Sequence, residues 1–81
     1  MSMNSPKIDL TTFFLSISSA GFMSLENAPV DLEFAKQNID LLELMKEKTQ
    51  GNRSSEEEAL LEQLLFQIRM KFVEKKKELG T

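Results

Sequence analysis

Acidic side chains are the groups in this sequence that come closest to forming a chemical site. The run from Glu56 to Glu58 could hold a hard cation such as Ca²⁺ or Mg²⁺ through carboxylate oxygens. Glu43 and Glu47 are four residues apart, so a helix would place both on one face. Acid–base catalysis by two carboxylates requires them to be buried together, so that their pKa values separate. The helical pattern puts these glutamates on the polar side, and they are interpreted as solvated surface charges.

Two residue types that carry much of enzyme chemistry are missing, because the sequence has no histidine and no cysteine. Histidine is the commonest general base and transition-metal ligand, and cysteine supplies thiolates, disulfides and zinc–thiolate sites. The serine cluster Ser16, Ser18 and Ser19 has no neighbouring base to activate a nucleophile. Glycine-rich phosphate-binding motifs and the nucleophile elbow are also missing from the sequence. The sequence therefore predicts a protein that is not an enzyme and holds no cofactor or metal.

Basic side chains near the C-terminus raise the alternative of nucleic-acid binding. They are Arg69, Lys71 and the run from Lys75 to Lys77. The net charge of −3 gives no general attraction to phosphates, and a single aromatic residue, Phe72, lies among the basic ones. Attachment to a membrane surface is another alternative, but an interfacial helix usually carries Lys or Arg on its polar face. Contact with protein is favoured over both alternatives.

Composition favours helices. With 41% hydrophobic and 28% charged residues, the sequence is typical of a globular protein, and two prolines and three glycines leave long uninterrupted stretches. A chain of 81 residues forms one domain near the size at which a single core is adequate. We expect an all-α fold, with a disordered tail over residues 1–7 and a single helical domain over residues 8–79. Its three helices are predicted at about residues 9–25, 31–50 and 54–78.

Helix ends are marked by capping residues. Asp9 and Asp31 are suited to cap the first and second helices, because their carboxylates accept hydrogen bonds from free backbone N–H groups. Gly51 follows the second helix, at the position where a residue in the left-handed backbone conformation commonly ends a helix. Ser54 and Glu57 have the spacing of a capping box at the start of the third helix. The short, well-marked turn predicts that the last two helices form an antiparallel hairpin.

The first predicted helix is unusual because it carries no charge from Leu10 to Leu25. Its apolar side chains cover more than half of the helix circumference, so it must be covered on more than one side. The stretch is shorter than the roughly 20 residues of a membrane span. A signal peptide is disfavoured, because Lys7 is the only basic residue before it and Asp9 follows. Burial against protein is the preferred interpretation.

The third predicted helix carries two apolar stripes on nearly opposite sides, and a hairpin partner can cover only one of them. Together with the wide apolar arc of the first helix, this surplus predicts a homo-oligomeric bundle. A homodimer is the expected assembly, with a tetramer as the alternative. The candidate interface residues are apolar side chains of these two helices, namely Phe13, Phe14, Leu15, Ile17, Phe22, Phe66, Met70 and Val73.

Asn38 is a polar residue within the apolar arc of the second predicted helix. It is interpreted as a partly buried side chain bonded to a neighbouring backbone or side-chain group. The alternative is a role in setting the register of a helix partner, at a cost in stability.

Three segments of the sequence resemble a known family. They are DLTTFFLSISS, VDLEFAKQNIDLLELMKEKTQGN and SSEEEALLEQLLFQIRMKFV, and they lie within about residues 8–74. The most specific parts are AKQNIDLL, EKTQGN and EEALL with their spacing. The chain resembles a small bacterial family of helical proteins catalogued as domain of unknown function 1844. The resemblance implies a bacterial, cytoplasmic protein of helical fold, and it implies no activity.

The chain departs from the family pattern at the turn. The family often has Leu and then Thr-Pro after Gly-Asn, where this sequence has Arg53, Ser54 and Ser55. Ser54 keeps the capping role, whereas Arg53 is expected to give up an apolar contact across the turn.

No specific biochemical function follows from these features. The leading interpretation is a small, non-enzymatic helical protein for oligomerisation or protein interaction. The alternative is an accessory or regulatory subunit that binds a different protein through its surplus apolar face. Association with membranes or nucleic acid, and a ligand pocket between subunits, are less favoured.

Overall fold

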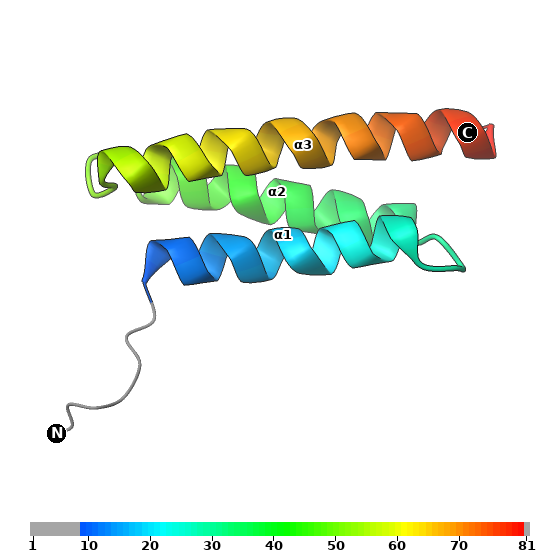
Figure 1. Ribbon diagram of the computed structural model, residues 1–81, viewed down its shortest axis with the longest axis horizontal. Helices are drawn as coiled ribbons and strands as arrows, with labels where there is room; N and C mark the ends of the chain where they lie inside the picture. Colours follow the sequence, from blue (N-terminus) through cyan, green and yellow to red (C-terminus); the bar gives the residue numbers. More distant parts are fainter. Residues whose placement is uncertain (1–8, 81) are drawn as a thin grey trace, which may run out of the picture.

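The computed structural model describes residues 9–80, which form three helices and no strand (Figure 1). Helix α1 spans Leu10–Glu26, α2 spans Leu32–Lys48 and α3 spans Ser55–Leu79. The prediction of an all-α protein with three helices is confirmed for this part of the chain. The predicted disordered tail over residues 1–7 lies outside the described residues.

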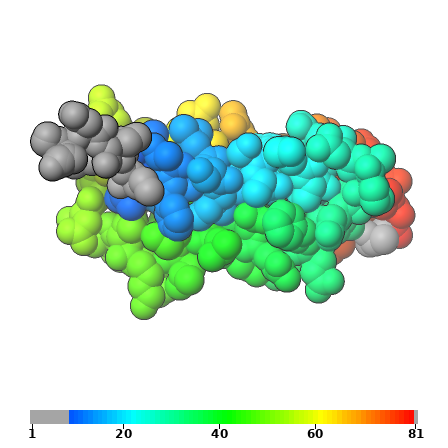
Figure 2. All heavy atoms as spheres, turned by 90° about the horizontal axis from the view of Figure 1, so that it is seen from below, coloured from blue at the N-terminus to red at the C-terminus, as the bar shows by residue number. Residues whose placement is uncertain are grey.

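The three helices lie side by side, and the chain reverses direction at each connection (Figure 1). As a result, α1 and α3 point the same way, and α2 runs against both. Each helix contacts the other two. Figure 2 shows α1 and α2 packed along one another on one face of the molecule. The first helix therefore packs on its own chain, against two neighbours.

Helix α3 is longer than its partners, with 25 residues against 17 in each of the others. At 1.5 Å per residue, it measures about 37 Å, against about 25 Å for α1 or α2. It runs past the helical ends of both (Figure 1). Part of α3 therefore has no intramolecular neighbour to cover it.

The core lies where the inward faces of the three helices meet. One of the two predicted stripes of α3 consists of Leu61, Leu65, Ile68 and Phe72, and it faces the core. The first three are fully buried, and Phe72 is partly buried. Side chains three and four residues apart share a helix face, which explains why each helix contributes a regular stripe. The buried apolar residues are Phe14, Ile17, Leu25, Ala35, Ile39, Leu42, Leu61, Leu64, Leu65 and Ile68.

Gly21 lies at a tight contact of α1 with both other helices, which was not predicted from the sequence. A Cβ placed on Gly21 would lie 2.5 Å from Cδ1 of Ile68 in α3 and 3.2 Å from Cβ of Asn38 in α2. Only a residue without a side chain lets the backbone of α1 come this close to both neighbours.

The predicted caps are confirmed. Asp9 accepts a hydrogen bond from the backbone N–H of Thr12 at 2.9 Å, and Asp31 accepts one from Phe34 at 3.0 Å. The backbone N–H of Glu57 donates to the Ser54 hydroxyl at 3.1 Å. In return, the Glu57 carboxylate accepts from the N–H of Ser54 at 2.8 Å, which completes the capping box.

The turn after α2 contains the predicted left-handed glycine, because Gly51 has φ +85°. The helix itself ends at Lys48, two residues before the predicted boundary at residue 50. Thr49 follows the helix, and its backbone N–H makes an ordinary helical bond to the carbonyl of Met45 at 2.9 Å. Its hydroxyl donates to the same carbonyl at 2.6 Å, a bond of the kind that competes with regular helix geometry.

Candidate interaction surface

The outer face of α3, formed by Phe66, Met70 and Val73, is the most prominent apolar surface of the chain. These side chains are 65%, 58% and 54% exposed. Their spacing of four and then three residues places them on one side of the helix, turned away from the core stripe. The second stripe that the sequence predicted is therefore present on the surface. Its role as an interface remains a prediction.

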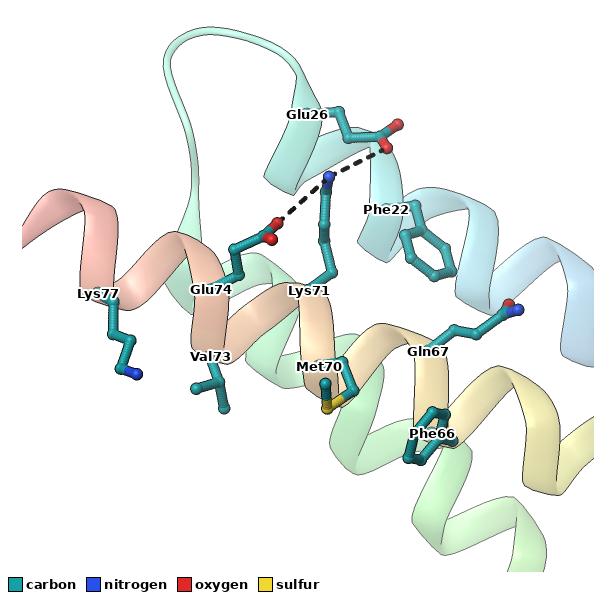
Figure 3. Close-up of a pocket in the computed structure, with 9 residues that line it drawn as sticks. All are labelled: Phe22, Glu26, Phe66, Gln67, Met70, Lys71, Val73, Glu74 and Lys77. Carbon is teal, nitrogen blue, oxygen red and sulfur yellow. Dashed lines mark ion pairs between the residues drawn. The ribbon is translucent and has the colours of Figure 1, made fainter.

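A groove of about 640 Å³ runs beside this face, between α3 and the end of α1. In Figure 3, Phe66, Met70 and Val73 project from one side of α3, and Phe22 extends from α1 toward α3. The groove is lined by Phe22 and Glu26 of α1 and by Phe66, Gln67, Met70, Lys71, Val73, Glu74 and Lys77 of α3. Its lining therefore combines apolar and charged side chains.

Lys71 joins the two sides of the groove. Its ammonium lies 3.8 Å from the carboxylate of Glu26 in α1 and 3.6 Å from that of Glu74 in α3 (Figure 3). Both carboxylates are more than half exposed, so each pair contributes little to stability. The two ion pairs of Lys71 therefore set where these charges lie beside the groove more than they strengthen the fold.

The candidate interface residues of α1 divide into two groups. Phe14 and Ile17, predicted as interface residues, are core residues of the chain itself, with 0% and 8% exposure. This outcome follows from the packing of α1 on both α2 and α3, which uses the centre of its apolar arc. Phe13 and Leu15, at the edges of that arc, remain 40% and 46% exposed, and Phe22 is half-buried. The surplus surface of α1 is therefore smaller than the sequence indicated.

A further set of exposed apolar side chains lies on α2. Phe34 and Leu41 are each 44% exposed, and they lie seven residues apart on one side of the helix. Their exposure is lower than that of the outer face of α3. This set is a secondary candidate for contact with protein.

Asn38 is buried, with 6% exposure. Its side-chain amide donates to the backbone carbonyl of Phe34 at 2.9 Å. The interpretation as a buried side chain bonded to its own backbone is confirmed. Asn38 faces Gly21 within the chain, and its role in setting the register of a helix partner remains a prediction.

Arg53 is the residue whose role sequence reasoning missed. Its side chain is 6% exposed, and one guanidinium nitrogen donates to the carbonyl of Lys46 at 2.6 Å and to the Thr49 hydroxyl at 2.9 Å. The other terminal nitrogen lies 3.5 Å from the carboxylate of Glu58. No structural observation contradicts the expected loss of an apolar contact, but the sequence did not predict that Arg53 forms a polar bridge from the end of α2 to the start of α3.

The acidic residues that could do chemistry lie on the surface. Glu56 and Glu58 are exposed, and Glu43 is paired with Arg69. Within residues 9–80, no group of three or more acidic side chains is arranged to hold a metal ion. The clearest electrostatic effect is at Glu62, where the Lys46 ammonium at 2.7 Å lowers the pKa of the carboxyl below its ordinary value. The interpretation of these glutamates as solvated charges agrees with this geometry.

The basic residues considered for nucleic-acid binding are largely paired with acids. Arg69 contacts Glu43, Lys71 contacts Glu26 and Glu74, and Lys75 lies 3.3 Å from Glu78. Lys76 and Lys77 have no ion-pair partner among residues 9–80. The free positive charge of α3 is thus confined to its C-terminal end.

A search for membrane spans over the described part of the chain finds no helix with the length and apolarity needed to cross a bilayer.

Comparison with other proteins gives one informative result. Neither the curated proteins nor the solved structures contain a match to this chain. A family model matches residues 7–74, which is most of the sequence and includes the caps, the turn and the greater part of α3. The chain therefore belongs to the family described as Domain of unknown function (DUF1844).

Proposed function

We propose that this chain is a non-enzymatic helical protein that functions in protein interaction, first of all in self-association as a homodimer. The observation that carries the proposal is the outer face of α3. Phe66, Met70 and Val73 are all more than half exposed there, on a helix whose other side supplies the core. A contiguous apolar surface on the outside of a small protein is typical of an interaction site.

Burial of this face by a partner would contribute favourable free energy to association. Full burial of a large apolar side chain contributes about 1.5–3 kcal/mol. Since these three are already partly covered, each should contribute roughly 1–2 kcal/mol when a partner buries the rest. A dimer gains this twice, once from each copy, against the cost of association. The gain exceeds the lower estimates of this cost and supports a dimer, with a tetramer as the alternative assembly.

In this proposal the last two helices act as an antiparallel hairpin that presents α3 on the outside of an oligomeric bundle. The support is the Arg53 bridge, which ties the end of α2 to the start of α3. The family resemblance supports a cytoplasmic location, where such a bundle would meet other proteins.

Sedimentation of the purified chain at tens of micromolar tests the proposal. The wild-type chain should sediment as a dimer, and Phe66→Glu should return it to a monomer without loss of helix content. Phe34→Glu is the matched control, because it also adds a charge to an exposed aromatic position, but on α2. A wild-type monomer over this concentration range would contradict self-association.

A second candidate function is that of an accessory subunit for a different protein. The observation that favours it is the separate set on α2, where Phe34 and Leu41 are each 44% exposed. A dimer formed through α3 would leave this set uncovered. Co-purification at native expression should then give a stoichiometric partner, which Phe34→Glu loses and Phe66→Glu retains. Recovery of the chain without any partner would contradict this second function.

A further inference from the structure

We infer that the outer face of α3 is covered by the same face of a second copy, running antiparallel, with Phe66 of each copy opposite Met70 of the other. This inference rests on the proposed self-association and adds its geometry. It places the two-fold axis beside Gln67 and Ile68, close to the middle of α3.

The spacing along α3 indicates that another helix covers this face. Ala59, Gln63, Phe66, Met70, Val73 and Lys77 follow one another at intervals of four, three, four, three and four residues. This spacing matches the seam of a two-stranded coiled coil, and four of the six positions are apolar, so the face suits a second helix at a small crossing angle. All six residues are exposed in the chain. A seam of this length needs a straight helix of similar length as its partner, and α3 itself is such a helix.

The charges at the two ends of the seam favour one direction of the second helix. The C-terminal end of the seam carries Lys76 and Lys77, which have no ion-pair partner among residues 9–80. The N-terminal end carries Glu56, also exposed and without an ion pair among those residues, and the half-exposed Glu62, which pairs with Lys46 of its own chain. A parallel copy would place Lys77 against Lys77. An antiparallel copy places lysines against glutamates at both ends.

The register follows from matching the layers of the seam. In an antiparallel coiled coil, each layer joins an a position of one helix to a d position of the other. Phe66 therefore pairs with Met70, Gln63 with Val73 and Ala59 with Lys77. The small side chain of Ala59 leaves room for the stem of Lys77. The Lys77 ammonium then reaches toward Glu56 of the second copy, and Lys76 lies beside Glu62 of that copy. This register also overlaps the two helices over nearly their whole length.

The groove between α1 and α3 fits the same arrangement. Its volume of about 640 Å³ lies beside Met70, with Phe22 on the α1 side. Phe66 of the second copy arrives opposite Met70, so its ring can enter the groove and contact Phe22. The half-buried Phe22 would then become buried in the dimer.

Disulfide trapping tests the geometry, because the chain has no cysteine of its own. Ala59→Cys and Lys77→Cys are prepared as separate full-length variants, mixed at dimer-forming concentration and oxidised. The two positions are 18 residues apart, about 27 Å along the helix. An antiparallel dimer should give mainly the mixed disulfide, whereas a parallel one should give mainly the two homodisulfides. Gln37→Cys, at an exposed position on α2, measures the background of random collision.

The outcomes separate this inference from the proposed function. A predominant mixed disulfide, lost when Phe66→Glu is added to both variants, is the expected result. A wild-type dimer in sedimentation that yields homodisulfides, or no disulfide above the Gln37→Cys background, would overturn the antiparallel pairing and leave self-association intact. A wild-type monomer would overturn both.

Discussion

Substitution of Gly51 by alanine isolates the contribution of one backbone conformation to the stability of the helical turn. Gly51 has φ +85°, and an added Cβ would meet nothing within 4 Å. The effect of the substitution is therefore backbone strain without a steric clash. A left-handed conformation costs a residue with a Cβ about 1–2 kcal/mol. Alanine also restricts the unfolded chain, which returns about 0.4–1 kcal/mol. We expect a net loss of about 1 kcal/mol in the free energy of unfolding.

Urea denaturation followed by circular dichroism measures this loss, at one protein concentration because association contributes to apparent stability. The midpoint should fall while the slope stays unchanged. In a domain of this size, a loss of 1 kcal/mol lowers Tm by roughly 4–8 °C. Gly51→Asn should lose less, since asparagine tolerates the left-handed region.

Gly80 supplies a matched control. It also has a positive φ, +76°, with nothing within 4 Å of an added Cβ, but it caps the free C-terminal end of α3. Gly80→Ala should therefore leave global stability almost unchanged, because fraying of the last turn does not unfold the core. A Gly51→Ala chain that is as stable as the wild type, or more stable, would refute the reasoning about the turn.

Three further substitutions probe the turn, the surface charges and the core. Arg53→Met should lower the free energy of unfolding by about 1–3 kcal/mol in urea titrations, since it leaves the Lys46 carbonyl and the Thr49 hydroxyl without their buried donor; an unchanged midpoint would contradict the bridge. The lowered pKa of Glu62 means that its pair with Lys46 stabilises the fold above the ordinary pKa of the carboxyl. This stability is lost as the pH falls through the lowered value in the folded state. Glu62→Gln should therefore flatten the acid limb of a stability–pH curve, and an unaltered limb would argue against the pair. Leu65→Ala should cost about 2–5 kcal/mol in the same titrations, because the side chain is fully buried between the helices; a smaller loss would indicate that the core is loosely packed.

Local signals made much of the fold predictable. The capping residues and Gly51 act through bonds and dihedral angles within a few residues of their own position, so a short segment contains the whole signal. That Phe66, Met70 and Val73 share one side of α3 was predictable for a similar reason, whereas their exposure to solvent was not. Helical periodicity alone separates them from the core stripe of α3.

The features that could not be predicted depend on contacts between helices. Whether Phe14 lies in the core or at an interface depends on how α1 divides its apolar arc between two neighbours. The requirement for glycine at position 21 appears only when Ile68 and Asn38 are brought against it. The role of Arg53 depends on the path of the turn, which brings the last carbonyls of α2 within reach of the guanidinium. Spacing along the sequence contains none of this information.

Sedimentation equilibrium of the wild-type chain and of Phe66→Glu tests most directly the claim that the outer face of α3 mediates self-association. At tens of micromolar, the wild-type chain should have about twice the mass of the 9.3 kDa chain, and Phe66→Glu should have the mass of one chain with its helix content preserved. A wild-type mass of 9.3 kDa throughout, or a Phe66→Glu variant that stays dimeric, would contradict the claim.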